Sequence, residues 1–166
     1  MEGITIRAAT EQDCGRILAL IRELAEYEHM EQEVTATEDT LRASIFQRHM
    51  AGVFVAEAEK QVIGYALYCH NFSTFLGREN LYLEDLYVTP AWRGHGIGTG
   101  LIRRVARQAV EEGCQRLDWV CLDWNRPSRD FYEKLGAHAM PWWVGYRAEG
   151  EALQQLAGIS RERSEK

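Results

Sequence analysis

The alternation of apolar and polar residues predicts a strand, a helix and a hairpin in the first half of the chain. Residues 3–8 alternate in hydrophobicity, which is typical of a strand with one buried face. Apolar side chains then recur every three to four residues from Ile17 to Ala25, which predicts an amphipathic helix. Two further apolar runs, residues 53–57 and 62–70, flank a short polar turn and together predict a β-hairpin.

The densest pattern lies past the middle of the chain. Residues 81–88 have the composition of a strand, which ends before Pro90 because proline has no N–H group to donate to a sheet. Four glycines follow between residues 94 and 100. Apolar residues then repeat at helical spacing from Leu101, and Gly113 is suited to cap the end of that helix. The order is therefore strand, glycine loop and helix.

Shorter segments complete the pattern. Those with a predicted regular structure are a helix over 40–47, a strand over 117–122, a helix over 128–135, a terminal strand or strand pair over 137–148, and a helix over 151–157. We also expect a polar connection over 71–80 and a charged tail over 160–166. This order of elements predicts the α/β class in its mixed α+β form, with a central, mostly antiparallel sheet and helices on both faces.

Composition narrows the class of protein. A chain of 166 residues with 46% hydrophobic and 27% charged residues is expected to form one soluble domain, residues 1–166. The net charge of −6 argues against nucleic acid or an anionic membrane as the partner. No apolar run is long enough for a membrane span, so we expect a cytoplasmic protein. The four cysteines are widely spaced without a CxxC pair, which predicts reduced thiols and no metal site.

The glycine loop between the strand and the helix is suited to bind an anion. Glycines remove side-chain obstruction, and the positive end of the helix dipole favours negative charge, so we expect a phosphate-bearing ligand. A nucleotide-binding P-loop is excluded because no lysine occurs between Glu79 and Gly100. The dinucleotide fingerprint is excluded because its glycine spacing is not met. The alternative is a glycine-rich turn that binds nothing.

Arg93-Gly94-His95-Gly96-Ile97-Gly98 matches the pattern Arg/Gln-x-x-Gly-x-Gly/Ala, and in this the chain resembles the GNAT acyltransferase superfamily. The resemblance implies acetyl-CoA as co-substrate. Its pyrophosphate is expected on the backbone amides of Arg93, Gly94, His95, Gly96, Ile97, Gly98 and Thr99. The strand before the loop is expected to offer backbone groups to acetyl-CoA at Leu86, Tyr87 and Val88.

A second segment of the chain resembles the same superfamily. Trp124-Asn125-Arg126-Pro127-Ser128 precedes a stretch that contains Phe131-Tyr132 and Gly136-Ala137. The resemblance places Asn125, Ser128 and Tyr132 at the cofactor and makes Tyr132 the general acid. A phenol with a pKa near ~10 is protonated at neutral pH, so it can give a proton to the departing thiolate. The alternative for Tyr132 is a core aromatic residue.

Two adjacent carboxylates, Glu84 and Asp85, interrupt the apolar strand before the loop. Neighbouring residues of a regular strand point to opposite faces, so we expect the two side chains to have different roles. Glu84 is the candidate base that removes a proton from an ammonium substrate, directly or through water. The alternative is a polar pair on a surface strand.

More narrowly, the chain resembles the spermidine/spermine (diamine) acetyltransferases and their thialysine-acetylating relatives, from Ile6 to about Ala137. The resemblance rests on the stretches 6–10, 21–28 and 82–88, on the glycine loop and on residues 122–125. It implies a homodimer with the amine site near the subunit boundary. The residues that it implies at the amine are Tyr27, Glu28, Glu84, Asp85, Asp118, Trp119 and Val120.

Two stretches of the sequence bear on how an amine substrate is recognised. Residues 22–39 hold seven acidic residues and one basic residue, which is either a solvated helix face or an electronegative rim that attracts an amine. The acidic Glu-Glu-Gly-Trp-like segment of polyamine acetylators is replaced here by Met140–Tyr146. Trp142, Trp143 and Tyr146 could contact an ammonium through cation–π interactions, or pack in the core or a dimer interface.

These features predict direct transfer of an acetyl group from acetyl-CoA to a primary amine of a small molecule. The expected acceptor is a diamine or polyamine, or an amino acid of the thialysine or lysine kind. One alternative is an acyl-CoA-binding sensor or interaction module without turnover. The other is a protein or peptide N-acetyltransferase.

Overall fold

A computed structural model describes residues 3–159 of the chain. The chain divides into two compact units, and the division falls after Val120. The first unit contains the sheet and the glycine loop, and the second contains the Tyr132 segment.

The first unit is built on a five-stranded sheet with the order β1-β2-β3-β4-β5. The strands are β1 (Ile4–Ala8), β2 (Gly52–Ala58), β3 (Gln61–Ser73), β4 (Arg78–Val88) and β5 (Leu117–Asp118). The first four strands pair antiparallel with their neighbours in the chain, and β5 pairs with β4 in parallel. The expected mixed, mostly antiparallel sheet is therefore confirmed.

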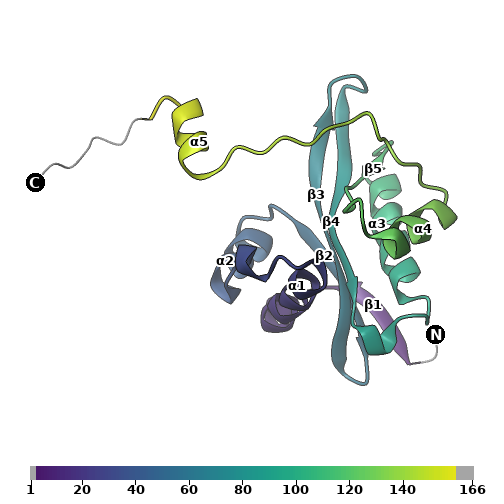
Figure 1. The fold of residues 1–166 in the computed structure, drawn as a ribbon. Coiled ribbons are helices and arrows are strands. Elements are labelled where there is room, and N and C mark those ends of the chain that lie inside the picture. Colours follow the sequence, from purple (N-terminus) through teal and green to yellow (C-terminus); the bar gives the residue numbers. More distant parts are fainter. Residues whose placement is uncertain (1–2, 160–166) are drawn as a thin grey trace, which may run out of the picture. The chain divides into compact units, whose positions relative to one another are not determined.

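Helices cover both faces of this sheet (Figure 1). The longer helices are α1 (Cys14–Glu28) and α3 (Ile97–Glu111), and α2 (Glu38–Arg42) continues into a wider helical turn, η3 (Ala43–Gln47). Helices α1 and α2 lie on one face and α3 on the other. The core under α1 and η3 joins Ile17 and Ile45 to sheet residues that include Val55, Tyr65 and Tyr87. The amphipathic spacing seen in the sequence thus gives α1 and α3 one buried stripe each.

An ionic network joins the start of α1 to the edge of the sheet. The guanidinium of Arg7 on β1 contacts both Asp13, at 2.8 Å, and Glu57 on β2, at 2.7 Å. The Asp13 carboxylate also accepts a hydrogen bond from the Thr10 backbone N–H at 2.7 Å. These donors hold the pKa of the buried Asp13 at about 2, below its usual 3.8, with the Arg7 hydrogen bond the largest cause.

Replacing Asp13 by asparagine is expected to cost about 2 kcal/mol of unfolding free energy at neutral pH. The folded-state pKa of Asp13 lies below its unfolded value. The stabilisation is therefore complete above the unfolded pKa and is lost as pH falls through about 2. Urea denaturation should show a deficit for Asp13→Asn near neutrality that shrinks toward pH 2. Asp39→Asn is the matched control, because Asp39 pairs with Arg42 while almost fully exposed, and it should change little.

Three predicted elements differ in the structure. Residues 71–80 are mostly strand, because β3 and β4 extend as a long hairpin that pairs Asn71 with Asn80 around a turn at 74–77. Strand β5 is only Leu117–Asp118, so most of the strand predicted over 117–122 is absent. No strand forms over residues 137–148. The polar residues of 71–80 do not show the composition typical of a strand, so the sequence did not reveal the hairpin. The other two segments have no neighbouring strand in the described chain with which to form backbone hydrogen bonds.

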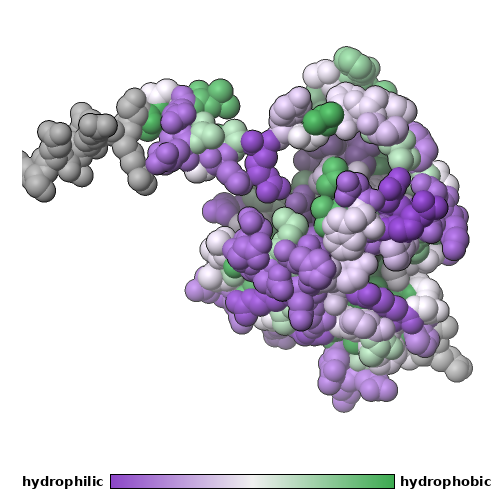
Figure 2. Space-filling view, in the orientation of Figure 1, coloured by the Kyte–Doolittle hydropathy of each residue, from purple (hydrophilic) through white to green (hydrophobic). Residues whose placement is uncertain are grey.

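The tip of the β3–β4 hairpin is apolar. Phe72 and Phe75 are exposed there, and Figure 2 shows hydrophobic atoms gathered at this tip above a mainly polar face.

The second unit holds two helices, α4 (Arg126–Lys134) and α5 (Gly150–Leu156). Asn125 caps α4, since its side-chain oxygen accepts the backbone N–H of Ser128 at 3.2 Å. Both predicted helices are confirmed, with the first beginning two residues earlier than expected. The predicted tail over 160–166 lies outside the described residues.

Candidate active site

The glycine loop forms the entrance to α3, as the sequence predicts. Gly94 and Gly96 have φ of 82° and 76°, a left-handed conformation that favours glycine, and nothing lies within 4 Å of where a Cβ would project. Gly96 is the N-cap of α3, and the first turn of this helix contains no acidic residue. The first N–H groups of a helix have no acceptor inside it, so those after Gly96 are available to an anion. The loop therefore fits a pyrophosphate.

Arg93 turns its side chain away from the loop and back under α1. Its Nε donates to the backbone oxygen of Val88 at 2.9 Å. Its guanidinium lies over the rings of Tyr27, at 5.1 Å, and Tyr87, at 5.4 Å. The Arg93 side chain thus ties the end of β4 to the end of α1 by a hydrogen bond and two cation–π contacts. The first residue of the loop motif therefore orders the loop, a role that the motif alone does not reveal.

The edge of β4 that faces β5 is open over most of its length. Strand β5 pairs only with Leu81 and Tyr82 of β4. Among the described strands, Leu86, Tyr87 and Val88 have partners only on β3. Alternate residues of a strand direct their backbone groups to either side. This part of β4 can therefore offer backbone hydrogen bonds to a bound acyl chain, as the resemblance implies.

A β-bulge separates Glu84 and Asp85 from the regular ladder. Asp85 pairs with Leu67 and Leu83 with Tyr68, which leaves Glu84 as the extra residue of β4. A bulge interrupts the alternation of side chains, so the expectation that Glu84 and Asp85 point to opposite faces does not apply here. The two carboxylates interact electrostatically, and the charge of Glu84 raises the pKa of Asp85. Regular alternation could not reveal this, because the bulge arises from pairing with β3.

Asp85 is held by a tyrosine that the sequence analysis did not single out. The hydroxyl of Tyr65 on β3 donates to Asp85 Oδ2 at 2.9 Å, and Tyr65 is fully buried. Burial raises the pKa of Asp85 to about 6, from its usual 3.8, while the hydrogen bond from Tyr65 lowers it. The charges of Glu84 and Glu28 raise it further. Asp85 therefore titrates close to neutral pH.

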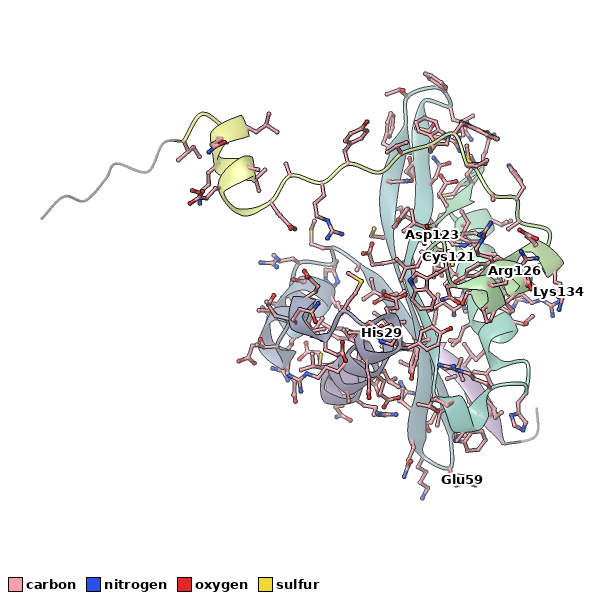
Figure 3. All side chains as sticks on the ribbon, in the orientation of Figure 1. His29, Glu59, Cys121, Asp123, Arg126 and Lys134 are labelled. Atoms are coloured by element: carbon pink, nitrogen blue, oxygen red, sulfur yellow. The ribbon has the colours of Figure 1, made fainter. Side chains whose placement is uncertain are left out.

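The end of α1 brings Glu28 toward the same carboxylates. Burial raises the pKa of Glu28, and its charge acts on both Asp85 and Tyr65. Figure 3 labels His29, which caps the C-terminus of α1 with a φ of 60°. The negative end of a helix dipole also favours a cation.

The rest of the acidic run is largely solvated. Glu26, Glu31 and Glu33 are exposed, and Arg42 lies 2.8 Å from Asp39 and 3.8 Å from Glu38. Glu28 alone in the run has a pKa raised by burial. The solvated-face interpretation therefore describes most of the run, and the electronegative interpretation applies to its point of contact with β4.

Asp118, Trp119 and Val120 lie at and just beyond the end of β5. Asp118 pairs with Tyr82 of β4, two residues from the bulge. Burial raises the pKa of Tyr82, and the charges of Glu84 and Asp118 add to this. Val120 is exposed. Their assignment to the amine stays a prediction.

The second unit carries the remaining predicted residues on α4. Figure 3 labels the two ends of this helix, Arg126 and Lys134. Asn125 is buried and caps the helix, and the rings of Phe131 and Tyr132 lie 5.3 Å apart. These contacts order α4, and the cofactor roles of Asn125, Ser128 and Tyr132 stay predictions of the resemblance.

The aromatic stretch after α4 is exposed. Trp142, Trp143 and Tyr146 are each more than two-thirds accessible in the structure. Packing of these rings in the core of the chain is therefore not observed, which leaves the ammonium and dimer-interface interpretations.

Residues 3–159 contain no cluster of three or more His, Cys, Asp or Glu side chains that could hold a metal ion. No helix within that range has the length and apolar character needed to cross a membrane.

Comparisons with known proteins identify the family. Residues 14–137, which include the glycine loop and α4, match the acetyltransferase (GNAT) family. The chain belongs to the acetyltransferase (GNAT) family. It is 45% identical to the thialysine N-epsilon-acetyltransferase of Bos taurus, over 95% of this chain and 99% of that protein. It is also 32% identical to the spermidine/spermine N(1)-acetyltransferase-like protein 1 of Homo sapiens, over 95% of this chain and 24% of that protein.

A solved structure shares the fold of this chain. An integron cassette protein from the mobile metagenome of V. cholerae has a TM-score of 0.79 and 29% identity, over 95% of this chain and 99% of that chain. GNAT enzymes use acetyl-CoA as co-substrate, which fits the open first turn of α3 after Gly96. The predicted N-acetyltransferase activity is confirmed.

Proposed function

We propose that this GNAT enzyme transfers the acetyl group of acetyl-CoA to the side-chain primary amine of a thialysine- or lysine-like amino acid. The observation that carries the proposal is the carboxylate cluster of Glu28, Glu84 and Asp85, in a chain 45% identical to a thialysine acetyltransferase. None of the three carboxylates forms an ion pair with a cationic side chain of residues 3–159. An ammonium substrate would supply the missing positive charge.

A short acceptor is favoured over a long polyamine. Residues 140–146 lack the acidic side chains that the resemblance associates with polyamine acetylation. A polycation needs several spaced anions, whereas one carboxylate cluster suits a single ammonium group.

The proposed chemistry is direct transfer. The α3 N-terminus binds the pyrophosphate, and backbone N–H groups of β4 polarise the thioester carbonyl. A carboxylate of the cluster removes a proton from the ammonium, with Glu84 as the candidate predicted from the sequence. Tyr132 gives a proton to the leaving thiolate, a role that rests on its motif. Acetyl-CoA, when bound, supplies the activated acyl group.

The test of the proposed function is CoA release from acetyl-CoA across a panel of amines. The panel comprises thialysine, lysine, short diamines, spermidine, an aromatic amine and a peptide that contains lysine. We expect the highest kcat/KM with thialysine or lysine. A higher kcat/KM with spermidine would assign the protein to the diamine branch, and one with the peptide would assign it to peptide acetylation.

We further propose that residues 1–166 act as one catalytic domain in a cytoplasmic homodimer. The exposed Trp142, Trp143 and Tyr146 support this, because large aromatic side chains are enriched at protein interfaces. Light scattering after gel filtration should give a mass near twice the monomer's 19.1 kDa. Replacing both tryptophans with serine should reduce that mass to the monomer value.

A further inference from the structure

The Tyr65–Asp85 pair leaves the two oxygens of one carboxylate in different environments. Oδ2 accepts the hydroxyl of Tyr65 at 2.9 Å. Tyr65 is the side chain of the described residues that hydrogen-bonds to this carboxylate, and Asp85 is half-buried. The half-buried Asp85 is therefore not sealed from solvent, while its Oδ2 is anchored to the core through Tyr65.

Tyr65, whose hydroxyl anchors Asp85 Oδ2, is itself held in place by the core. Tyr65 packs in the core beside Ile17, Val55 and Tyr87, so its ring has little freedom to turn. A hydroxyl fixed in this way selects one orientation of the Asp85 carboxylate. The bulge displaces Glu84 from the ladder, and Glu84 is exposed and forms no hydrogen bond with its side chain within residues 3–159. Asp85 is thus the oriented carboxylate of the pair and Glu84 the unanchored one.

We propose that Asp85, rather than Glu84, accepts the proton that the ammonium substrate loses, and that Tyr65 is its positioning residue. The proposal rests on the acetyl transfer proposed above. One N–H bond of the ammonium breaks and its proton bonds to Asp85 Oδ1. The freed lone pair attacks the thioester carbonyl carbon and the C–S bond breaks. The new amide nitrogen loses its second proton, which balances the proton that Tyr132 gives to the thiolate. Asp85 then returns its proton to solvent.

The charges around Asp85 suit this task. The groups that face it are Tyr65 from β3, Glu84 from its own strand and Glu28 from α1, and Tyr87 faces Tyr65. Burial raises the pKa of Asp85 to about 6. A base is most effective when its pKa lies near the working pH, because it is then ionised and still basic enough to take a proton. The hydrogen bond from Tyr65 lowers the pKa of Asp85, whereas the charges of Glu84 and Glu28 raise it. Substitutions of these neighbours should therefore shift the pKa in opposite directions, which makes the assignment testable.

The experiment compares the pH dependence of kcat/KM for the full chain and three conservative variants. The wild type should lose activity as pH falls through about 6, because Asp85 becomes protonated. Asp85→Asn should lower kcat/KM about 100-fold and abolish this loss of activity at low pH, which is the acid limb of the pH profile. Tyr65→Phe removes a hydrogen bond that lowers the pKa, so the limb should move up by about one pH unit. Glu84→Gln removes a charge that raises the pKa, so the limb should move down.

A weakly basic amine provides a rescue test. An acceptor that is already neutral at the assay pH needs no base, so Asp85→Asn should approach wild-type rates with it. Each variant's acetyl-CoA Kd and melting temperature would be measured alongside. If Tyr65→Phe fails to fold, Glu28→Gln gives a second downward shift, because the charge of Glu28 also raises the pKa of Asp85.

The outcomes separate this inference from the proposed function. If Glu84→Gln loses the acid limb and Asp85→Asn keeps it, Asp85 is not the acceptor and the inference is wrong. If the wild type binds acetyl-CoA but acetylates no amine of the panel, the proposed function fails first. Opposite shifts for Tyr65→Phe and Glu84→Gln would support the inference, since general destabilisation would not move the limb in two directions.

Discussion

Tyr132→Phe is expected to lower kcat about 100-fold while the Kd for acetyl-CoA changes less than about threefold. The substitution removes one hydroxyl and keeps the aromatic ring, so the ring contact with Phe131 and the packing of α4 should survive. Loss of a general acid leaves the thiolate to depart unprotonated, which raises the barrier of the chemical step alone. Steady-state kinetics with the best amine, together with calorimetric titration of acetyl-CoA, would measure both quantities.

Tyr68→Phe is the matched control for this prediction. Tyr68 is half-buried and stacks on Phe54, with ring centroids 5.4 Å apart, and no catalytic role is proposed for it. The same removal of a hydroxyl should leave its kcat near the wild-type value. A Tyr132→Phe enzyme that turns over as fast as this control would exclude Tyr132 as the acid. An equal loss in kcat for both variants would indicate a general effect of removing a tyrosine hydroxyl.

Gly96→Asp is expected to raise the acetyl-CoA Kd about 100-fold, which corresponds to about 2.7 kcal/mol. The side chain would project from the N-cap of α3 into open space, where the pyrophosphate is proposed to bind. A carboxylate there opposes the phosphate charge, yet it interacts favourably with the helix dipole. Asp also tolerates the left-handed conformation of Gly96 better than most residues. Binding should therefore fall far more than stability.

Gly113→Asp isolates the effect of position. Gly113 has a φ of 78°, close to the 76° of Gly96, and an added Cβ meets nothing within 4 Å at either glycine. It follows the C-terminal end of α3, whereas Gly96 precedes the N-terminal end. The Gly113 variant should lose stability, because the helix dipole disfavours negative charge at that end, and should bind acetyl-CoA normally. Equal Kd values for the two variants would place the pyrophosphate elsewhere.

The long-range pairings of the chain were the least predictable features. The bulge at Glu84 depends on how β4 aligns with β3, and a one-residue change in register redirects every side chain beyond it. The hydrogen bond from Tyr65 to Asp85 links residues 20 positions apart and needs both strands in place. Tyr65 gave no sequence signal, because an apolar strand that contains two tyrosines has the composition of any core strand.

The sequence by itself determined the features that depend on neighbouring residues. These include the helix stripe of α1, the glycine loop with its helix, and the motif around Tyr132. Backbone conformation, capping and helical periodicity are local properties, so residue types and spacing suffice to predict them. The tertiary structure alone decided that Arg93 lies between Tyr27 and Tyr87, that Glu28 approaches β4, and that Asp85 is anchored to a buried tyrosine. Those contacts join distant segments, and their electrostatic consequences arise from burial, which a linear pattern does not contain.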